Sequence, residues 1–318
     1  MSNRGEGVNW PLDESDEHGS RKTTGTVKKV WISAVENASK SLAEKVANEK
    51  KWRQNYHHIV NEIICEQAKD KQNALSIAEN GLKEVYNQFT FIRDGKELLL
   101  KDAMETYTED LFESVEFSGS SKPKSIDFGI TVAELKDLAE KSEIEPDVAD
   151  SMKVVLENSE SFIETLKDTW FVLLGSTSEL CPLKKLLELG LNVVAISRPS
   201  PKRQAKVIQL AKESSGKLIV PVRKVADKSK ETSEICGADV TVDTPELRTW
   251  LLSLKKDKRL VIGSYIYLDG AAHVLASCAM DAIVKDLVDK RPGTALAYLM
   301  SPSTVYPIPA AAAEDAKA

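Results

Sequence analysis

The sequence contains few cysteines, no excess of basic residues and no long apolar run, and each shortage excludes a class of protein. Its four cysteines are spread over 318 residues without a Cys-x-x-Cys pair. This pattern argues against a disulfide framework and against a zinc site, so we expect free thiols and no bound metal. The formal net charge of −6 offers no broad basic face for a phosphodiester backbone, and we therefore expect no nucleic-acid partner.

Segments that direct a protein to a membrane are also lacking. No apolar stretch approaches the roughly 20 residues that are needed to span a bilayer. The first residues are polar and include several acids, unlike a secretory signal or an arginine-rich transit peptide. We therefore expect a cytoplasmic protein without a membrane partner.

What the sequence does have is the composition of a globular protein. Hydrophobic residues make up 42% and charged residues 29% of a chain that is long enough for two domains. Residues 1–24 and 308–318 are polar or rich in small residues, and we expect both to be disordered tails.

Residues 25–117 are predicted to be mainly helical. Apolar residues recur there at steps of three and four: Trp31, Val35, Ala38, Leu42 and Val46. Asp94-Gly95 separates two short apolar runs, which indicates a hairpin, and a further helix is expected over residues 101–113. We expect this helical region to support assembly into a homo-oligomer.

Residues 118–167 are predicted to contain a linker and helices that pack on the following domain. The stretch 118–125 is rich in Ser, Gly, Lys and Pro, as linkers are. Thr131 and Glu134 then have the spacing of a capping box, which indicates the start of a helix.

Residues 168–307 show a different pattern, in which apolar runs alternate with helical periods. The expected strands are 170–174, 192–196, 218–222, 240–242, 260–264 and 295–299. Strands that alternate with helices form parallel βαβ units. We therefore predict an α/β domain whose open, doubly wound parallel sheet has about six strands.

Polar residues follow the first of these strands, at the edge where open parallel sheets bind ligands. The segment consists of Gly175, Ser176, Thr177, Ser178 and Glu179. A glycine permits a tight turn, and free N–H groups at the start of the next helix would face an anion. These residues are candidates for cofactor binding; the alternative is a plain tight turn without a ligand.

Ser197 and Arg198 follow the second strand, about 20 residues after that turn, where dinucleotide sites contact the adenosine ribose. An acidic residue there would hold the ribose hydroxyls of NAD. Arg198, with Lys202 and Arg203 in the next turn, would suit the 2′-phosphate of NADP instead. The alternative is that Arg198 is an ordinary surface residue.

From the Gly175 turn onward, the chain resembles the Rossmann-type NAD(P)-binding superfamily, which includes the short-chain dehydrogenases/reductases. The resemblance implies a Rossmann-like fold and a dinucleotide cofactor, with NADP as the better candidate. The glycine fingerprint is incomplete, because Thr177 and Leu180 stand where the second and third glycines belong. In that family the second glycine lets the backbone approach the pyrophosphate closely.

A third polar cluster follows the fifth predicted strand. Tyr265, Tyr267, Asp269 and His273 are candidate catalytic residues, because a phenol, a carboxylate and an imidazole in one cleft can donate and accept protons. The Tyr-x-x-x-Lys pair of short-chain dehydrogenases/reductases is absent. The alternative is structural, with Asp269 as the N-cap of a helix and His273 as an ordinary helix residue.

Three functions therefore remain open. The first is a nucleotide-binding protein of the Rossmann type, as an NADP-dependent oxidoreductase acting on a small molecule. The second is a non-catalytic scaffold on the same fold, which the incomplete glycine pattern favours. The third is an S-adenosylmethionine-dependent methyltransferase, which would need an acidic residue where Ser197 stands.

Overall fold

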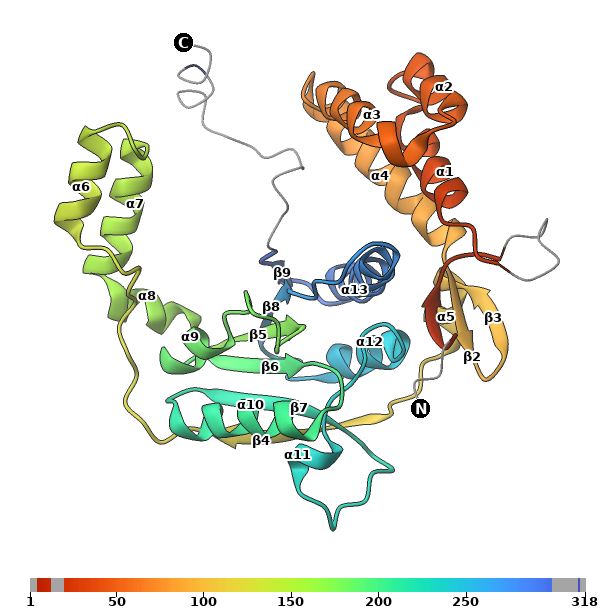
Figure 1. Ribbon diagram of the computed structural model, residues 1–318. Helices are drawn as coiled ribbons and strands as arrows, with labels where there is room; N and C mark the ends of the chain where they lie inside the picture. Colours follow the sequence, from red (N-terminus) through yellow and green to blue (C-terminus); the bar gives the residue numbers. More distant parts are fainter. Residues whose placement is uncertain (1–4, 13–19, 299–313, 315–318) are drawn as a thin grey trace.

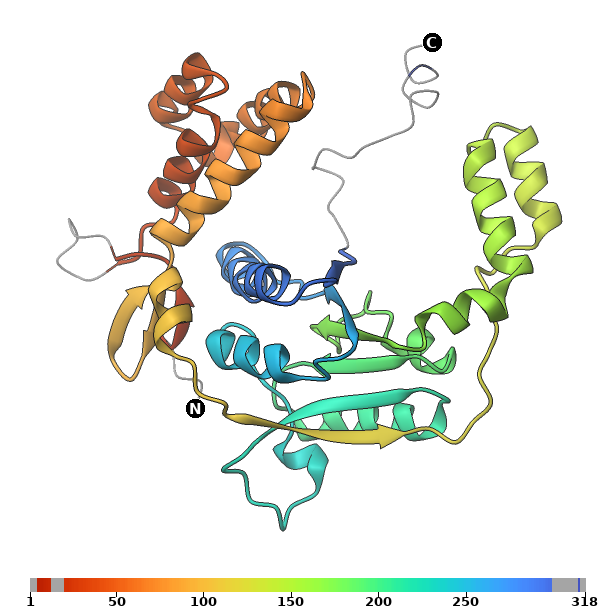
Figure 2. The same cartoon turned by 180° about the vertical axis from the view of Figure 1, so that it is seen from behind.

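A computed structural model describes residues 5–12, 20–298 and 314. Within them the chain forms a six-stranded sheet, a three-stranded sheet and helices that cover or flank both. Helices near the N-terminus and helices from the middle of the chain rise from opposite ends of the large sheet (Figures 1 and 2). No helix among the described residues combines the length and apolarity that a membrane crossing requires.

The large sheet is mostly parallel. Its strands are β4 (Phe112–Ser118), β5 (Thr169–Leu174), β6 (Asn192–Ile196), β7 (Lys217–Arg223), β8 (Arg259–Ser264) and β9 (Ala295–Leu296). They lie in the order β4-β7-β6-β5-β8-β9, and β4 is antiparallel to β7 while the other neighbours are parallel. The α/β class and five of these strands, all but β4, were expected from the sequence. The all-parallel arrangement was not correct, because β4 is antiparallel to its neighbour.

Helices cover both faces of this sheet. The four main ones are α9 (Leu183–Glu188), α10 (Pro201–Glu213), α12 (Thr244–Ser253) and α13 (Ala271–Lys290). Alternate side chains of β5 point to opposite faces, so Val172 joins one core with α12 and α13 while Leu173 joins the other with α9 and α10. Burial on both faces explains why these strands are continuous apolar runs in the sequence.

Residues 240–242, predicted as a strand, form a turn instead. Asp239 accepts hydrogen bonds from the backbone N–H of Thr241 (3.0 Å) and from its hydroxyl group (2.7 Å). The N–H of Val242 is also taken, by the carbonyl of Asp239 at 3.0 Å. A short polar side chain that forms hydrogen bonds with the nearby backbone competes with the hydrogen bonds of a strand. Here the local hydrogen bonds of Asp239 form, and the segment is a turn. The short helix α11 (Thr232–Ile235) precedes this turn.

The sixth strand comes from a region predicted to be helical. Helix α5 (Leu100–Thr106) ends early, and β4 then adds to the edge of β7 over seven residues. Strand β4 buries Phe112 towards one core and packs Val115 and Phe117 against the other. Its interspersed glutamates and serine leave it with a partly polar surface, as suits an edge strand.

The N-terminal part is helical with a small antiparallel sheet. Its elements are β1 (Gly7–Asn9), α1 (Thr24–Val35), α2 (Lys40–Asn48), α3 (Trp52–Gln67), α4 (Lys71–Gln88), β2 (Thr90–Arg93) and β3 (Lys96–Leu99). The predicted hairpin is present: Asp94 and Gly95 have φ values of 51° and 74°, as a two-residue type I′ turn requires.

The expectation of a disordered tail over residues 1–24 is wrong for part of that segment. Gly7–Asn9 pairs with β2, and the side chains of Val8 and Trp10 are buried in the main core. The ring of Trp10 lies 4.8 Å from that of Phe89, measured between centroids. A short apolar segment among polar residues was thus enough to dock the chain. The predicted tail over residues 308–318 lies outside the described residues, apart from residue 314.

The stretch predicted as a linker is tied to the body of the protein. The N–H groups of Gly119 and Ser121 donate to the carbonyls of Gly216 and Ser214. A Cβ atom on Gly119 would stand 2.1 Å from the carbonyl oxygen of Ser214, so a glycine is needed for this approach. The glycine here therefore serves close backbone packing.

Three helices follow this stretch: α6 (Val132–Glu140), α7 (Pro146–Glu157) and α8 (Ser159–Leu166). The predicted capping box is present, since Thr131 accepts from the N–H of Glu134 and Glu134 accepts from that of Thr131. Helices α6 and α7 stand away from the sheet, as Figure 1 shows, instead of packing on it as expected. Several apolar side chains of α7 and α8 are exposed: Val148, Val154 and Phe162.

Candidate functional site

A cavity of about 180 Å³ lies beyond the carboxyl ends of β5, β6 and β8. It is lined by Gly175, Thr177, Ser178, Ser197, Arg198, Arg203, Ala238, Asp239, Val240, Thr241, Ile266, Tyr267 and Leu268. The chain leaves β5 towards β6 on one side, and later returns to β8 on the other side of β5. Helices on the two sides then diverge, and open α/β sheets form ligand crevices at such a point.

The Gly175 turn is built differently from the expected anion cradle. The N–H groups of Gly175 and Ser176 both donate to the carbonyl of Ile196, at 2.9 and 3.0 Å, so neither is free for a phosphate. Helix α9 begins at Leu183, several residues after the turn, and has only six residues. The start of this helix agrees with the sequence, but the two amides of the turn itself are occupied.

Gly175 is nevertheless required where it stands. Its φ is +92°, and an added Cβ would lie 2.8 Å from the backbone nitrogen of Ile266 and 2.7 Å from that residue's Cγ1. The loop after β8 thus crosses directly over the turn after β5. Glycine here allows two loops to meet, which is a packing reason for the residue.

The five residues predicted to bind a cofactor at this turn are only partly brought together. Gly175, Thr177 and Ser178 line the cavity, whereas Ser176 and Glu179 do not. Ser176 is only 3% exposed, and its hydroxyl group has no hydrogen-bond partner within the described part of the chain. Glu179 is exposed to solvent.

Ser197 and Arg198 both line the cavity, as predicted for residues at the end of the second parallel strand. The buried side chain of Gln204 donates to the hydroxyl of Ser197 at 3.1 Å and approaches its carbonyl at 3.3 Å. Gln204 lies on α10, so this helix fixes the loop from which Arg198 projects. The backbone of Arg198 is thereby held by hydrogen bonds from Gln204, which also donates to the Arg198 carbonyl at 3.3 Å.

Two arginines face this cavity without a carboxylate partner in the part of the chain that the structure describes. Neither Arg198 nor Arg203 forms an ion pair with any described residue, and both are exposed. Arg203 and Lys202 stand in the first turn of α10, which contains no acidic residue and whose N-cap, Ser200, makes no side-chain cap hydrogen bond. Positive charges at a helix N-terminus are unfavourable by about 0.3–1 kcal/mol each. A bound anion would offset this repulsion.

The segment Ala238–Thr241 is a part of the site that the sequence did not indicate. Ala238 and Val240 are buried and offer an apolar floor, and Asp239 presents its carboxylate beside them. One carboxylate oxygen holds the backbone of Thr241, whereas no hydrogen bond to the other is found among the described residues. The neighbouring residues 240–242 are predicted as a strand, and this gave no reason to expect the half-buried carboxylate of Asp239 in the site. The Asp-x-Thr pattern after a glycine was the available signal for a turn.

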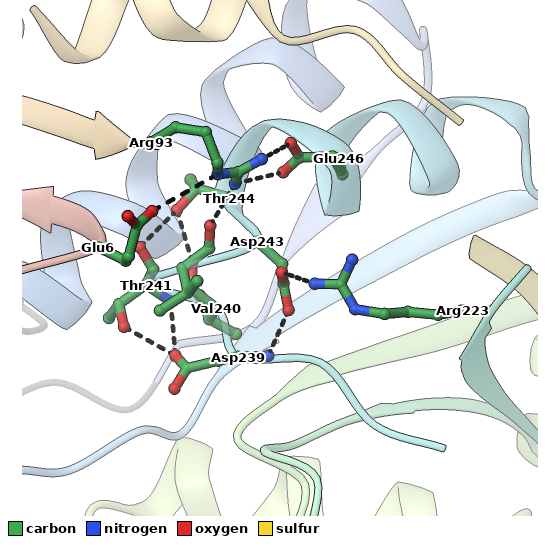
Figure 3. Close-up of polar contacts among 10 residues, drawn as sticks. Glu6, Arg93, Arg223, Asp239, Val240, Thr241, Asp243, Thr244 and Glu246 are labelled. Carbon is green, nitrogen blue, oxygen red and sulfur yellow. Dashed lines mark hydrogen bonds and ion pairs between the residues drawn. The ribbon is translucent and has the colours of Figure 1, made fainter. Parts of the chain in front are cut away.

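Buried ion pairs hold this segment in place (Figure 3). Arg93 of β2 pairs with Glu246, whose side chain is fully buried, and also donates to the carbonyl of Val242 at 2.8 Å. Arg223 of β7 pairs with Asp243. Burial raises the pKa of Asp243, while Arg223 acts in the opposite direction. A charge removed from water is tolerated when it is paired in this way.

The N-terminal strand completes the support. The N–H of Val8 donates to the carbonyl of Thr241 at 2.8 Å. Gly7 has a φ of +88°, and a Cβ on it would stand 2.2 Å from the same carbonyl oxygen. The segment 238–243 is therefore fixed between the parallel sheet and the N-terminal sheet.

The four candidate catalytic residues do not converge on this cavity. Among them Tyr267 lines it, with a side chain that is 75% exposed. Tyr265 folds back over Gly263, where its ring atoms would meet an added Cβ at 2.3 Å, and burial raises the pKa of its phenol. Asp269 is exposed, and the N-cap position of α13 is Gly270 instead.

His273 lies beside Tyr267, with ring centroids 5.5 Å apart, but it faces a second cavity. Its Nδ1 accepts a long hydrogen bond from the N–H of Leu268 (3.4 Å). The imidazole therefore helps to position the loop after β8. Of the four candidate catalytic residues, the phenol of Tyr267 is the group that lines the first cavity. The carboxylate that lines it is Asp239.

No group of three or more metal-ligating side chains occurs among the described residues. Comparisons with family models, with curated proteins and with solved structures found no match for this chain.

Proposed function

We propose that this chain is a nucleotide-binding α/β protein of the Rossmann type, and that the cavity beside Arg198 takes the adenosine end of the ligand. One observation carries the proposal: the same cavity is lined by an apolar floor, by two arginines without carboxylate partners among the described residues, and by a carboxylate oxygen that accepts no hydrogen bond from those residues. In chain order the parallel strands lie 3-2-1-4-5. This order corresponds to the first five strands of the 3-2-1-4-5-6 order of dinucleotide-binding sheets, in which ligands lie beyond the carboxyl ends of the strands.

Each side of the cavity suits a different part of a nucleotide. Ala238 and Val240 can support a planar base, and Asp239 can accept a hydrogen bond from an exocyclic amino group. Arg198 and Arg203 can bind a phosphate with paired N–H donors. A 2′-phosphate on the ribose would lie in this region, so NADP is the preferred ligand.

The size of the cavity limits what it holds. A volume of about 180 Å³ is below the roughly 300–1,000 Å³ that is typical of sites for whole small molecules. It is suited to one end of a dinucleotide. The pyrophosphate would have to lie over the Gly175 turn, whose first two amides already bond Ile196.

Hydride transfer is therefore the less supported part of the oxidoreductase hypothesis. A non-catalytic nucleotide-binding scaffold is the second candidate, favoured by the occupied amides of Gly175 and Ser176. An S-adenosylmethionine-dependent methyltransferase is less favoured, because Ser197 supplies no carboxylate at the end of β6 for a ribose.

Calorimetric titration of the full chain with NADPH, NADH and S-adenosylmethionine tests the proposal. We expect NADPH to bind at least about tenfold more tightly than NADH, because the two differ by the phosphate that the arginines would hold. Arg198→Glu should remove this preference. Lys206→Glu is the matched control, since Lys206 is exposed on α10, the helix that follows Arg198, and does not line the cavity.

Thermal denaturation gives a second readout. A ligand at one hundred times its dissociation constant stabilises the folded state by about 2.7 kcal/mol. Equal binding of NADPH and NADH would refute the role of Arg198, and no response to any nucleotide would refute the proposed function.

A further inference from the structure

A second cavity, of about 390 Å³, lies between α4, the end of β8 and α13. It is lined by Leu82, Val85, Ser264, Ile266, His273, Ser277, Cys278, Met280, Asp281 and Tyr298. Ile266 lines this cavity and the first one, and is a common wall between them. Its volume falls within the range that is typical of small-molecule sites.

Its walls divide into an apolar and a polar side. Leu82 and Val85 of α4, with Ile266 and Met280, form the apolar side. The polar side is one face of α13, where His273, Ser277 and Asp281 recur at four-residue steps. The N-terminal helices therefore complete a cavity on the α/β domain.

Asp281 is a carboxylate on the wall of this cavity, and no cation pairs with it within the described part of the chain. The hydroxyl of Tyr86 donates to its Oδ2 at 2.6 Å, but no lysine or arginine pairs with it among the described residues. Lys285, one turn further along α13, pairs with Asp289 instead. Burial raises the pKa of Asp281, while the Tyr86 hydroxyl and Lys285 lower it.

A purely structural role explains only half of this arrangement. The Tyr86 hydrogen bond joins α4 to α13, yet a neutral side chain could accept it equally well. A carboxylate brings a second oxygen and a charge to the cavity wall, and a desolvated charge without a partner is unfavourable. An ammonium group in the cavity would satisfy both.

We propose that this second cavity binds a small organic ammonium ion, with Asp281 as the acceptor and the Leu82–Val85–Ile266 side around the apolar body of the ligand. The hydroxyl group of Ser277 lines the same wall and can accept a further hydrogen bond. This inference does not depend on nucleotide binding at the first cavity, and its test is carried out without a nucleotide.

Three probes with one apolar body test the charge preference: benzylamine, benzyl alcohol and benzoate. The full chain is titrated with each at pH 8, and the ¹³C-methyl signal of Met280, assigned through Met280→Leu, reports binding at the cavity wall. We expect benzylamine to bind at least about tenfold more tightly than the other two, because a charge-assisted hydrogen bond is far stronger than a neutral one.

Two variants test separately the role of the Asp281 charge and the role of the open volume of the cavity. Asp281→Asn keeps an acceptor for Tyr86 and should weaken benzylamine binding by about tenfold, while leaving benzyl alcohol within about threefold. Ser277→Leu fills the cavity and loses only a hydrogen bond to the His273 carbonyl of its own helix; it should weaken all three probes. Melting curves of both variants establish that they are folded.

The proposal is overturned by any of three results. These are equal binding of benzylamine and benzyl alcohol, full benzylamine affinity in Asp281→Asn, and benzylamine binding that leaves the Met280 methyl signal unmoved. A failure of NADPH to bind at the first cavity would not affect it.

Discussion

Gly175 shows how a single residue can look like a ligand-binding motif and yet be needed for packing. A side chain there would meet the backbone of Ile266 and would hold an unfavourable positive φ. We expect Gly175→Ala to lower the free energy of unfolding by about 2–4 kcal/mol, because the φ strain and the backbone contact add. Urea denaturation measures this loss.

Gly293→Ala provides the matched control. Gly293 also has a positive φ, of +84°, but an added Cβ there would meet nothing within 4 Å. It should therefore destabilise by only about 1 kcal/mol, from φ strain alone. Equal losses in the two variants would mean that the Ile266 contact carries no energy.

The free energy of unfolding should depend on pH through a single residue, Asp281. Burial raises the pKa of Asp281 in the folded state, so the folded protein binds a proton that the unfolded chain releases more readily. Stability therefore falls as the pH rises from the unfolded pKa through the folded one. We expect Asp281→Asn to raise the free energy of unfolding at pH 8, by more than it does at pH 4.5.

Urea denaturation at the two pH values measures this difference. Asp289→Asn is the control, since Asp289 is exposed and pairs with Lys285 at the surface. It should change stability by less than about 1 kcal/mol at either pH. A stabilisation by Asp281→Asn that is the same at both pH values would contradict the assignment.

At the scale of elements, the sequence predicted what depends on local pattern. The runs that became β5, β6 and β8 are apolar on both faces, and the Asp94-Gly95 turn has its own chemistry. Strand β4 was missed because it pairs with β7 about a hundred residues further along, and periodicity carries no information about such a partner.

The residues that line the cavity were predicted only in part. Ser197 and Arg198 were predicted because they follow the end of a strand that local pattern reveals. Asp239 was missed because its place depends on a turn next to residues that were expected to form a strand.

The link between β2 and α12 gives a prediction at this scale. Arg93→Met leaves Glu246 as a buried carboxylate without its cation, and such a loss destabilises by about 3–5 kcal/mol. Replacing both residues, as Arg93→Met with Glu246→Leu, should recover most of that loss, because the buried carboxylate that lost its cation is removed as well. Equilibrium unfolding of the two variants measures the difference, and a double variant as unstable as Arg93→Met would show that shape, not charge, is at stake.

Over the whole molecule, two parts that the sequence separates share one core. Val8, Trp10 and Phe91 of the N-terminal sheet belong to the same cluster of buried residues as Trp170 and Val172 of the central strand. The α1–α4 helices have a cluster of their own, which includes Ile59 and Ile63. The boundary of cooperative folding is therefore expected between the helices and the N-terminal sheet, and not at residue 168 where the α/β pattern begins.

Hydrogen exchange at the central strand tests this boundary. Phe91→Ala removes a fully buried ring from the shared core and should destabilise it by about 3–5 kcal/mol. The amide of Val172 in β5 exchanges through global opening if the core unfolds as one unit, so its protection should fall by a similar free energy. Ile59→Ala, in the separate helical cluster, should lower protection in α3 and leave Val172 nearly unchanged. If Phe91→Ala leaves the protection of Val172 intact, the N-terminal sheet and the α/β domain fold independently, because a shared core cannot lose a buried ring at one end without lowering the opening free energy at the other.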